Sequence, residues 1–192
     1  MRNESEIPKD DVLSYLKKRQ GILDGVCITG CEPLLQKGLS DFIREIKSMG
    51  FLIKLDTNGA FPDILSEILS KDIVDFVAMD LKNSPEKYPL TCGIDNKTHN
   101  DFFLPFKKSI EIIMSGKIDY EFRTTIVPEL HSICDIEKMG TEINGAKRWY
   151  LQSFKDSGDL ISGPFTEPTR EYMEDLKQKA ENFAVLCEIR GM

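Results

Sequence analysis

Three stretches of this 192-residue sequence repeat one pattern, in which a short apolar run ends in a polar cluster and an amphipathic helix pattern follows. The runs and their polar endings are 26–29 before Gly30-Cys31-Glu32-Pro33, 51–56 before Thr57-Asn58-Gly59, and 74–79 before Asp80-Leu81-Lys82. Strands that alternate with helices of about 10 to 15 residues are typical of right-handed βαβ units. The pattern therefore predicts an α/β fold with a parallel sheet.

The rest of the chain continues the alternation. Three more strands are expected at 120–127, 148–154 and 183–189, which makes six in all. The expected helices are 8–20, 36–50, 62–71, 101–115, 133–143 and 169–182. The longer connections, 83–99 and 158–168, are interpreted as loops, and the first is the candidate for a mobile loop over the rim of the sheet. We expect one domain over 1–192, an open or partial barrel.

Composition excludes several classes of protein. A net charge of −7 and a pI near 5.0 argue against a non-specific nucleic-acid or anionic-membrane surface. No apolar stretch approaches the roughly 20 residues that span a bilayer, and the N-terminus has no signal-peptide core, so a cytoplasmic protein is expected. The five cysteines are odd in number and scattered, which favours reduced, buried thiols over disulfides.

The carboxyl ends of parallel strands meet at one edge of a sheet, where such folds bind ligands. The candidate residues at these ends are Thr29, Gly30, Cys31, Glu32, Asp56, Thr57, Asn58, Asp80, Lys82 and Arg123. Alternation also places Lys54 on the face of Asp56, and Glu121 on the face of Arg123. Acids beside a lysine and an arginine suit a zwitterionic ligand better than a bare phosphate. The alternative is that these charges only neutralise one another as interior ion pairs and helix caps.

The same endings carry a resemblance to a known family. Thr29-Gly30-Cys31-Glu32-Pro33 resembles the Gly-Gly-Glu-Pro motif of radical S-adenosylmethionine enzymes. The further order Leu55-Asp56-Thr57-Asn58-Gly59, Met79-Asp80-Leu81-Lys82 and Arg123-Thr124-Thr125-Ile126-Val127-Pro128 is similar to the activating enzymes of glycyl radical proteins. Within that group, the chain most resembles the activating proteins of anaerobic ribonucleoside-triphosphate reductase. The resemblance covers almost the whole chain.

The resemblance implies a radical S-adenosylmethionine-like partial (βα)6 barrel and an oxidoreductase. In such enzymes a [4Fe-4S] cluster cleaves S-adenosylmethionine reductively, and the resulting radical abstracts a hydrogen atom from a glycine of the partner, a glycyl radical enzyme. By position, the backbone at 30–32 would meet the amino group of S-adenosylmethionine. Asp56, Thr57 and Asp80 would lie at its polar end, Lys82 and Arg123 would contact its carboxylate or hydroxyls, and Thr29 and Asn58 complete the cofactor-binding set. No catalytic residue is assigned.

The chain departs from the family pattern in two places. Family members carry Cys-x3-Cys-x2-Cys on a loop after a first strand, and this chain has neither that strand nor that loop. Three thiolates are required to hold the cluster. Cys27 and Cys31 have the x3 spacing, but the next position is Leu34, so no metal ligands for a cluster are expected here. Cys31 also replaces a family glycine, which costs about 1 to 2 kcal/mol if the position needs a positive φ and crowds the amino group, or else only narrows the pocket.

Two hypotheses remain open. In the first, the chain is a radical S-adenosylmethionine activating enzyme that works only with an N-terminal cluster segment missing from the sequence, so that the chain as given is inactive. In the second, it is a degenerate domain that binds a cofactor or a protein without catalysis. Either way, the strand at 26–29 becomes a sheet edge, which we expect to be covered by another chain, by the N-terminal segment or by a rearrangement. Self-association through this edge is one expected outcome.

Residues away from the strand ends support simpler interpretations. His131 is a candidate acid or base near the mouth of the barrel, although a lone loop histidine is usually a solvated one. Trp149 and Tyr150 lie on an expected strand and are interpreted as packing residues rather than as stacking platforms.

Overall fold

The computed structural model describes residues 7–94, 101–156, 158 and 163–192. Its six strands form a single sheet in the order β1-β2-β3-β4-β5-β6, and every neighbouring pair is parallel. The strands are β1 (Gly25–Ile28), β2 (Leu52–Thr57), β3 (Phe76–Asp80), β4 (Asp119–Ile126), β5 (Ala146–Ser153) and β6 (Ala184–Arg190). The α/β fold class and the six predicted strands are therefore confirmed, and the sheet is not closed.

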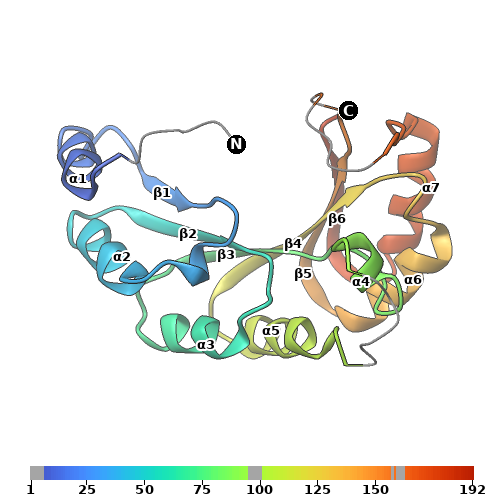
Figure 1. The fold of residues 1–192 in the computed structure, drawn as a ribbon, viewed down its shortest axis with the longest axis horizontal. Helices are drawn as coiled ribbons and strands as arrows, with labels where there is room; N and C mark the ends of the chain where they lie inside the picture. The colour runs from blue at the N-terminus through green and yellow to red at the C-terminus, as the bar shows by residue number, and fades with distance from the viewer. Residues whose placement is uncertain (1–6, 95–100, 157, 159–162) are drawn as a thin grey trace.

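Seven α-helices and one 3-10 turn accompany the described strands; α1 precedes β1 and the others lie in the connections. They are α1 (Lys9–Lys17), η1 (Pro33–Leu35), α2 (Leu39–Ser48), α3 (Pro62–Ser70), α4 (Tyr88–Thr91), α5 (Leu104–Ser115), α6 (Ile133–Glu142) and α7 (Arg170–Ala180). The helices α2, α3, α5, α6 and α7 lie along the convex side of the curved sheet, and the concave side opens into a hollow (Figure 1). We call the sheet face toward these helices the outer face and the face toward the hollow the inner face.

The two faces of the sheet differ in composition because side chains alternate along each strand. Outer-face residues are almost all apolar and buried, and they include Ile53, Leu55, Val77, Met79, Phe122, Trp149 and Leu151. The helices supply the matching surface, for example Ile43 and Ile46 of α2, which are fully buried. Inner-face positions carry the polar residues, so the core lies between the sheet and the helices, and the hollow is lined by charge.

The connection after β3 differs from the interpretation of 83–99 as a mobile loop. Asn83 and Ser84 are buried, and the short helix α4 follows them. The ring of Tyr88 is fully buried, with ring centroids 5.0 Å from Phe103 and 4.4 Å from Phe106. Part of the predicted loop is therefore a helix held by aromatic packing, while its mobility stays a prediction and 95–100 lie outside the described residues.

All five cysteines are free, but the expectation that they are buried is wrong for three of them. Cys27, Cys31 and Cys134 are exposed, Cys92 is half-buried and only Cys187 is buried. Cys27 lies in a strand, as expected, yet its side chain faces the hollow rather than the helices. An apolar stretch of sequence does not guarantee burial, because only the side chains that face the helices are covered.

Strand β1 lies at one edge of the sheet. It pairs with β2 alone among the described residues, with Cys27 opposite Lys54 in the register. What covers its other side stays a prediction. None of the helices in the described part of the chain has the length and apolar character needed to cross a membrane.

Candidate functional site

Arg123 joins the ends of three strands on the inner face. Its Nη1 lies 2.9 Å from Oδ2 of Asp56 on β2, and its Nη2 and Nε lie 2.9 and 3.1 Å from Oδ1 of Asp80 on β3. The register of the sheet explains this contact, since Asp80 is directly opposite Arg123 and Asp56 lies one strand further away. One guanidinium therefore holds two carboxylates at the rim of the hollow.

A second layer of charge adjoins the Arg123 contacts, which we call the rim layer. The Glu121 carboxylate accepts hydrogen bonds from Lys54 at 3.1 Å and from both terminal nitrogens of Arg190, at 3.1 and 3.3 Å. The Arg190 guanidinium lies over the Tyr150 ring, 3.3 Å from its centroid. Lys54 links the two layers, because its Nζ is also 3.7 Å from Oδ1 of Asp56.

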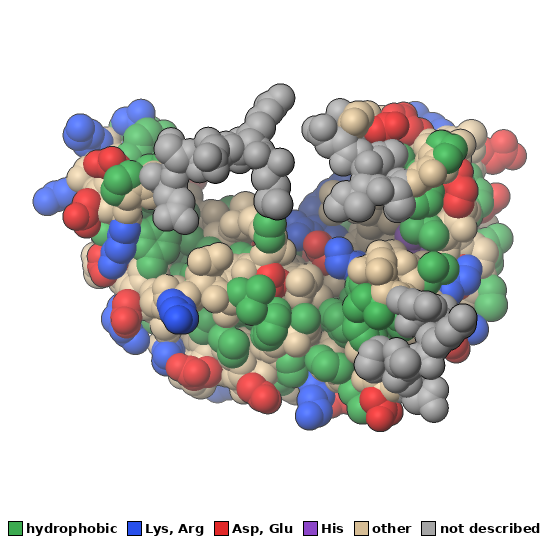
Figure 2. Space-filling model, in the orientation of Figure 1, with side chains coloured by type: hydrophobic (Ala, Val, Ile, Leu, Met, Phe, Trp, Pro, Cys, Tyr) green, Lys and Arg blue, Asp and Glu red, His purple; other side chains and the backbone are tan. Residues whose placement is uncertain are grey.

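These six charged side chains balance one another. The set consists of Lys54, Arg123 and Arg190 with Asp56, Asp80 and Glu121. Burial alone would raise the pKa of Glu121, but the hydrogen bonds from Arg190 and Lys54 outweigh it, and the pKa lies below its ordinary value. Burial would lower the pKa of Arg123, but Asp80 and Asp56 raise it. We call this set the charge network; acids and bases gather in the depth of the hollow in Figure 2.

One acceptor of the charge network lies near a cation but receives no hydrogen bond within the described part of the chain. Oδ1 of Asp56 is buried and has no hydrogen-bond partner among the described residues. The neighbouring thiol of Cys27 has a raised pKa, first because of burial and second because of the Asp56 charge, so it stays protonated at neutral pH. Lys54 at 3.7 Å offsets the charge of this oxygen, and a ligand that brings an N–H group would supply the missing hydrogen bond.

Glu32 organises the turn after β1. Its carboxylate is occupied by hydrogen bonds within the protein rather than open to a ligand. Its side chain is buried and accepts hydrogen bonds from the backbone N–H of Leu34 at 3.1 Å, from Oγ1 of Thr57 at 2.9 Å and from the N–H of Asn58 at 2.6 Å. Thr57 and Asn58 in turn accept from the N–H groups of Gly59 and Ala60. These three predicted site residues therefore lie together, but their side chains shape the two rim turns.

The rest of the predicted turn lies at the surface. Thr29 and Cys31 are exposed, and Gly30 between them has a φ of 144°, which favours glycine. Cys31 itself does not have a positive φ, since Asp72 is the one non-glycine residue with a positive φ in the described part of the chain. The expected backbone strain at Cys31 is therefore absent, because Gly30 makes the turn.

A cavity of about 220 Å³ adjoins the rim layer. Its lining contains Asp80, Lys82, Arg123 and Thr125 together with the apolar side chains of Leu81, Val127, Leu130, Phe154 and Phe165. Phe154 and Phe165 meet edge to face with their centroids 6.3 Å apart. Charged groups and an aromatic wall in one cavity suit a ligand with an ionic part and a flat apolar part.

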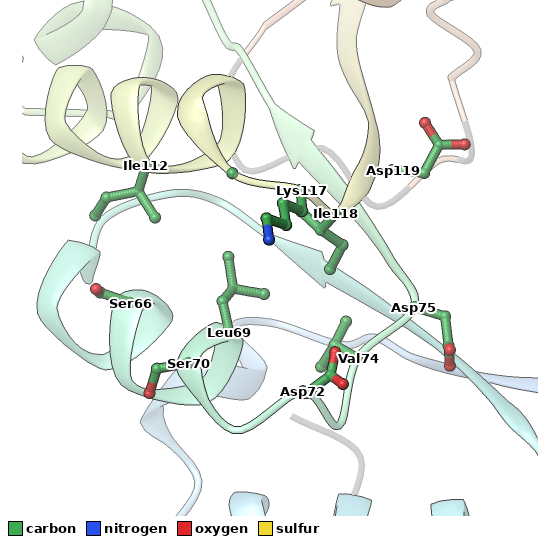
Figure 3. Close-up of a pocket in the computed structure, with 11 residues that line it drawn as sticks. Ser66, Leu69, Ser70, Asp72, Val74, Asp75, Ile112, Lys117, Ile118 and Asp119 are labelled. Atoms are coloured by element: carbon green, nitrogen blue, oxygen red, sulfur yellow. The ribbon is translucent and has the colours of Figure 1, made fainter.

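A larger cavity lies elsewhere in the described part of the molecule. It has a volume of about 690 Å³ and is lined by residues of α3 and α5 and of the connections that lead into β3 and β4, including Leu69, Asp72, Ile112 and Lys117 (Figure 3). Ligands of parallel α/β folds bind at the opposite, carboxyl ends of the strands. This cavity also lacks any member of the charge network, so its size alone does not make it the site.

One member of the charge network, Arg190 at the end of β6, is missing from the sequence analysis. Tyr150, which the sequence analysis interprets as a packing residue, is buried on the inner face of β5, and the Arg190 guanidinium lies over its ring. The search for polar strand ends stopped at four strands, although the same rule applied to the last strand would have found Arg190. Trp149 is fully buried, as expected for a packing residue.

His131 is neither a solvated loop residue nor open to a ligand at a ring nitrogen. It is 2% exposed, and both ring nitrogens lie within hydrogen-bond distance of backbone atoms of Lys82 and Val127. The expectation of solvation is wrong because the β4–α6 loop turns His131 under the rim.

Several known proteins are similar to this chain in sequence. No protein-family profile matches the chain. Two proteins of Methanocaldococcus jannaschii that carry the name glycyl-radical enzyme activating enzyme match it. MJ1227 is 29% identical over 83% of this chain and 68% of the relative. MJ1632 is 31% identical over 61% of this chain and 44% of the relative. A 7-carboxy-7-deazaguanine synthase of Thermoplasma acidophilum is 28% identical over 64% of this chain and 54% of the relative. The chain thus spans between 44% and 68% of the length of these curated relatives.

Solved structures agree with the sequence relatives in fold. Streptococcus suis SuiB bound to S-adenosylmethionine superposes with a TM-score of 0.68, at 13% identity, over 100% of this chain and 45% of SuiB. TYW1 with a lysine-pyruvate adduct gives a TM-score of 0.64, at 14% identity, over 92% of this chain and 62% of TYW1. At these identities the likeness is one of fold. Sequence relatives and fold together support a radical S-adenosylmethionine protein of the activating-enzyme type.

Proposed function

We propose that the chain binds S-adenosylmethionine at the rim of the hollow and serves in the activation of a glycyl radical enzyme. The observation that carries the proposal is the charge network with its one unused buried acceptor, Oδ1 of Asp56. S-Adenosylmethionine carries an ammonium, a carboxylate, a sulfonium and a flat adenine. A neutral network with a spare anionic acceptor, next to an aromatic-walled cavity, suits that combination.

The residues present offer a partner for each polar group of this ligand. In the proposal, Asp56 accepts a hydrogen bond from the ligand's ammonium, and the half-exposed Asp80 stabilises positive charge beside it. Lys82 and Arg123 face the carboxylate or the hydroxyls, and the lining of the 220 Å³ cavity excludes water from the apolar part. Thr29, Gly30, Cys31 and Glu32 lie on the turn that the proposal places beside the amino group, and Thr57 and Asn58 fix that turn through Glu32.

A [4Fe-4S] cluster does not fit the residues at hand. No three potential metal-ligating side chains lie together in the described part of the chain, whereas a site-differentiated cluster requires three thiolates. In activating enzymes the cluster with S-adenosylmethionine supplies the radical that removes a hydrogen atom from a glycine. We therefore assign cofactor binding to these 192 residues and the cluster thiolates to polypeptide other than the described residues, and we expect no reductive cleavage by the chain alone.

The names of the curated relatives support an activating role, and the partner in the proposal is an anaerobic ribonucleoside-triphosphate reductase-like protein. A polypeptide partner is compatible with the fold, since SuiB has been solved bound to its precursor peptide SuiA. The proposal includes a cytoplasmic location, supported by cysteines that are all free.

The test is calorimetric titration of the chain with S-adenosylmethionine, with S-adenosylhomocysteine as the matched ligand without the sulfonium charge. We expect both to bind and S-adenosylmethionine to bind more tightly; absence of binding by both would overturn the proposal. A second candidate function, a non-catalytic binding module, is favoured by the lack of cluster ligands among the described residues. Anaerobic reconstitution of the chain behind a Cys-x3-Cys-x2-Cys segment separates the two. Release of 5′-deoxyadenosine supports the enzyme, and binding without release supports the module.

A further inference from the structure

The loop at 127–132, between β4 and α6, connects several parts of the cavity wall. The carbonyl of Leu130 accepts hydrogen bonds from Nδ2 of Asn83 at 3.1 Å and from Nζ of Lys87 at 3.3 Å. Glu129 accepts from the backbone N–H and the hydroxyl of Thr166 at 3.0 and 2.6 Å. The hydroxyl of Tyr172 on α7 donates to the carbonyl of His131. The loop therefore holds together segments that are far apart in the sequence.

His131 is the buried residue of this loop, and its partners define its tautomer. Nε2 lies 2.8 Å from the carbonyl oxygen of Lys82, which can only accept, so Nε2 carries the proton. Nδ1 then accepts from the N–H of Val127 at 3.1 Å. The neutral ring is thus satisfied at both nitrogens.

A second proton on this ring would have no free acceptor. Nδ1 also lies 3.2 Å from the carbonyl oxygen of Val127, but that oxygen already accepts the N–H groups of Leu130 at 3.0 Å and of His131 at 2.9 Å. Protonation of Nδ1 would therefore leave the Val127 N–H without its acceptor and crowd an oxygen that is already used twice.

The His131 ring connects the segments that follow β3 and β4, beyond the last backbone hydrogen bond between them. The last register pair of β3 and β4 is Asp80 with Arg123, and the last backbone bond between these segments joins the Leu81 N–H to the Arg123 carbonyl at 2.8 Å. Lys82 and Val127 follow, and only His131 joins them among the described contacts. Lys82, Val127 and His131 all line the 220 Å³ cavity, so the His131 ring fixes the distance between Lys82 and Val127 in the cavity wall.

We propose that His131 is a positioning residue of the ligand cavity: its neutral imidazole holds the Lys82 carbonyl and the Val127 amide at the separation that ligand binding needs, and its protonation loosens that wall. The inference rests on the proposed function in so far as the ligand is S-adenosylmethionine. The ring does not touch the reacting atoms, and its effect on the ligand passes through Lys82 and the cavity wall.

The surroundings of the ring set the sign of the pH dependence. Burial lowers the pKa of His131, and the Lys87 charge on the β3–α4 connection lowers it further, while the backbone contacts and Asp135 on α6 raise it. The outcome is a pKa below 6.5. From α7 the facing group is Tyr172. The cavity wall is therefore expected to be intact at neutral pH and to loosen only below the ordinary histidine pKa of 6.5.

The experiment combines ring titration with ligand binding. The chain has two histidines, so NMR of the His99→Gln protein reports His131 alone. Titrations with S-adenosylmethionine between pH 7.5 and 5.5 are compared for that protein and for His131→Gln and His131→Phe on the same background. Gln keeps a donor for the Lys82 carbonyl and does not titrate, whereas Phe keeps neither contact, and thermal unfolding shows which variants fold.

We expect the affinity of the parent to fall about tenfold as the ring becomes protonated, and that of His131→Gln to be lower at pH 7.5 but independent of pH over this range. An unchanged pH profile in His131→Gln would overturn the inference. If the parent binds no S-adenosylmethionine, the proposed function fails while this inference is still decided by NMR. The Val127 amide resonance must then titrate together with the His131 ring, and a Val127 amide that ignores the ring titration contradicts the positioning role.

Discussion

Arg190 on β6 and Glu121 on β4 meet across the intervening strand, with contacts of 3.1 and 3.3 Å between guanidinium and carboxylate. The two strands share no backbone hydrogen bonds, since β5 lies between them. The Arg190 guanidinium lies over the ring of Tyr150 on β5. This contact therefore ties alternate strands of an unclosed sheet together on its inner face.

The first prediction concerns this contact. Glu121→Gln removes the negative charge that Lys54 and Arg190 share, and we expect a loss of about 1 to 2 kcal/mol in the free energy of unfolding. The value is below the roughly 3 to 5 kcal/mol of a fully buried pair because both cations are partly exposed. Urea unfolding measures the loss. The control is Glu45→Gln, whose partner Lys9 is at the surface and which should cost less than about 0.5 kcal/mol; equal losses would contradict the prediction.

A second prediction tests the unused acceptor. Asp56→Asn removes the anionic oxygen that we assign to the ligand's ammonium, so the affinity for S-adenosylmethionine should fall about tenfold or more. Asp119→Asn is the matched control, because Asp119 lies at the start of β4, away from the rim, and pairs with Arg148. Calorimetry should show a near-normal affinity for the control. Equal affinities of Asp56→Asn and the parent would remove Asp56 from the site.

The third prediction uses the pH dependence of stability. Burial would raise the pKa of Asp135, but hydrogen bonds from Lys87, Ser132 and Ser84 lower it from 3.8 to about 2. A depressed carboxyl pKa stabilises the fold above the unfolded value, and this stabilisation of about 2 kcal/mol is lost as the pH falls from about 4 toward 2. Asp135→Asn should therefore flatten the acid branch of the stability curve by about that amount.

Unfolding by urea at several pH values between 2 and 6 measures this branch. Asp41→Asn on the exposed side of α2 is the control, since its carboxylate pairs only with the exposed Arg44 among the described contacts. The assignment fails if both variants keep the parent's slope.

A fourth prediction concerns Cys31. Because this residue does not have a positive φ, Cys31→Gly relieves no strain and instead frees the unfolded chain, which should cost about 0.5 to 1 kcal/mol of stability. Replacement of Gly30, with its φ of 144°, by Ala should cost more. Denaturant unfolding of the two variants gives the comparison, and a stabilised Cys31→Gly protein would restore the strain argument. Parallel titrations with S-adenosylmethionine test whether Cys31 crowds the ligand.

Much of the architecture was predictable because each strand is apolar on its outer face and ends in polar residues. The apolar runs predicted all six strands, and the polar endings of four of them brought Asp56, Asp80 and Arg123 into one place. The same reasoning predicted that Glu32 and Thr57 lie at one edge of the sheet, but not that Glu32 accepts a hydrogen bond from the Thr57 hydroxyl. Local pattern is sufficient where helix packing decides which face is buried.

The misses have a common physical cause, which is that they depend on tertiary contacts. Helix α4 has only four residues and contains a proline, so its order comes from the burial of Tyr88 against Phe103 and Phe106. The burial of His131 depends on backbone atoms 49 residues away in the sequence. Neither contact leaves a periodic signal in the chain.

The separation of the two sheet faces has an evolutionary consequence. Since the helices pack against the outer face alone, a substitution on the inner face changes charge and shape in the hollow without disturbing helix packing. Such positions are free to diverge while the scaffold is retained. Proteins with this scaffold can therefore acquire new substrates by exchanging inward-pointing side chains outside the charge network, and those positions are where we expect related sequences to differ most.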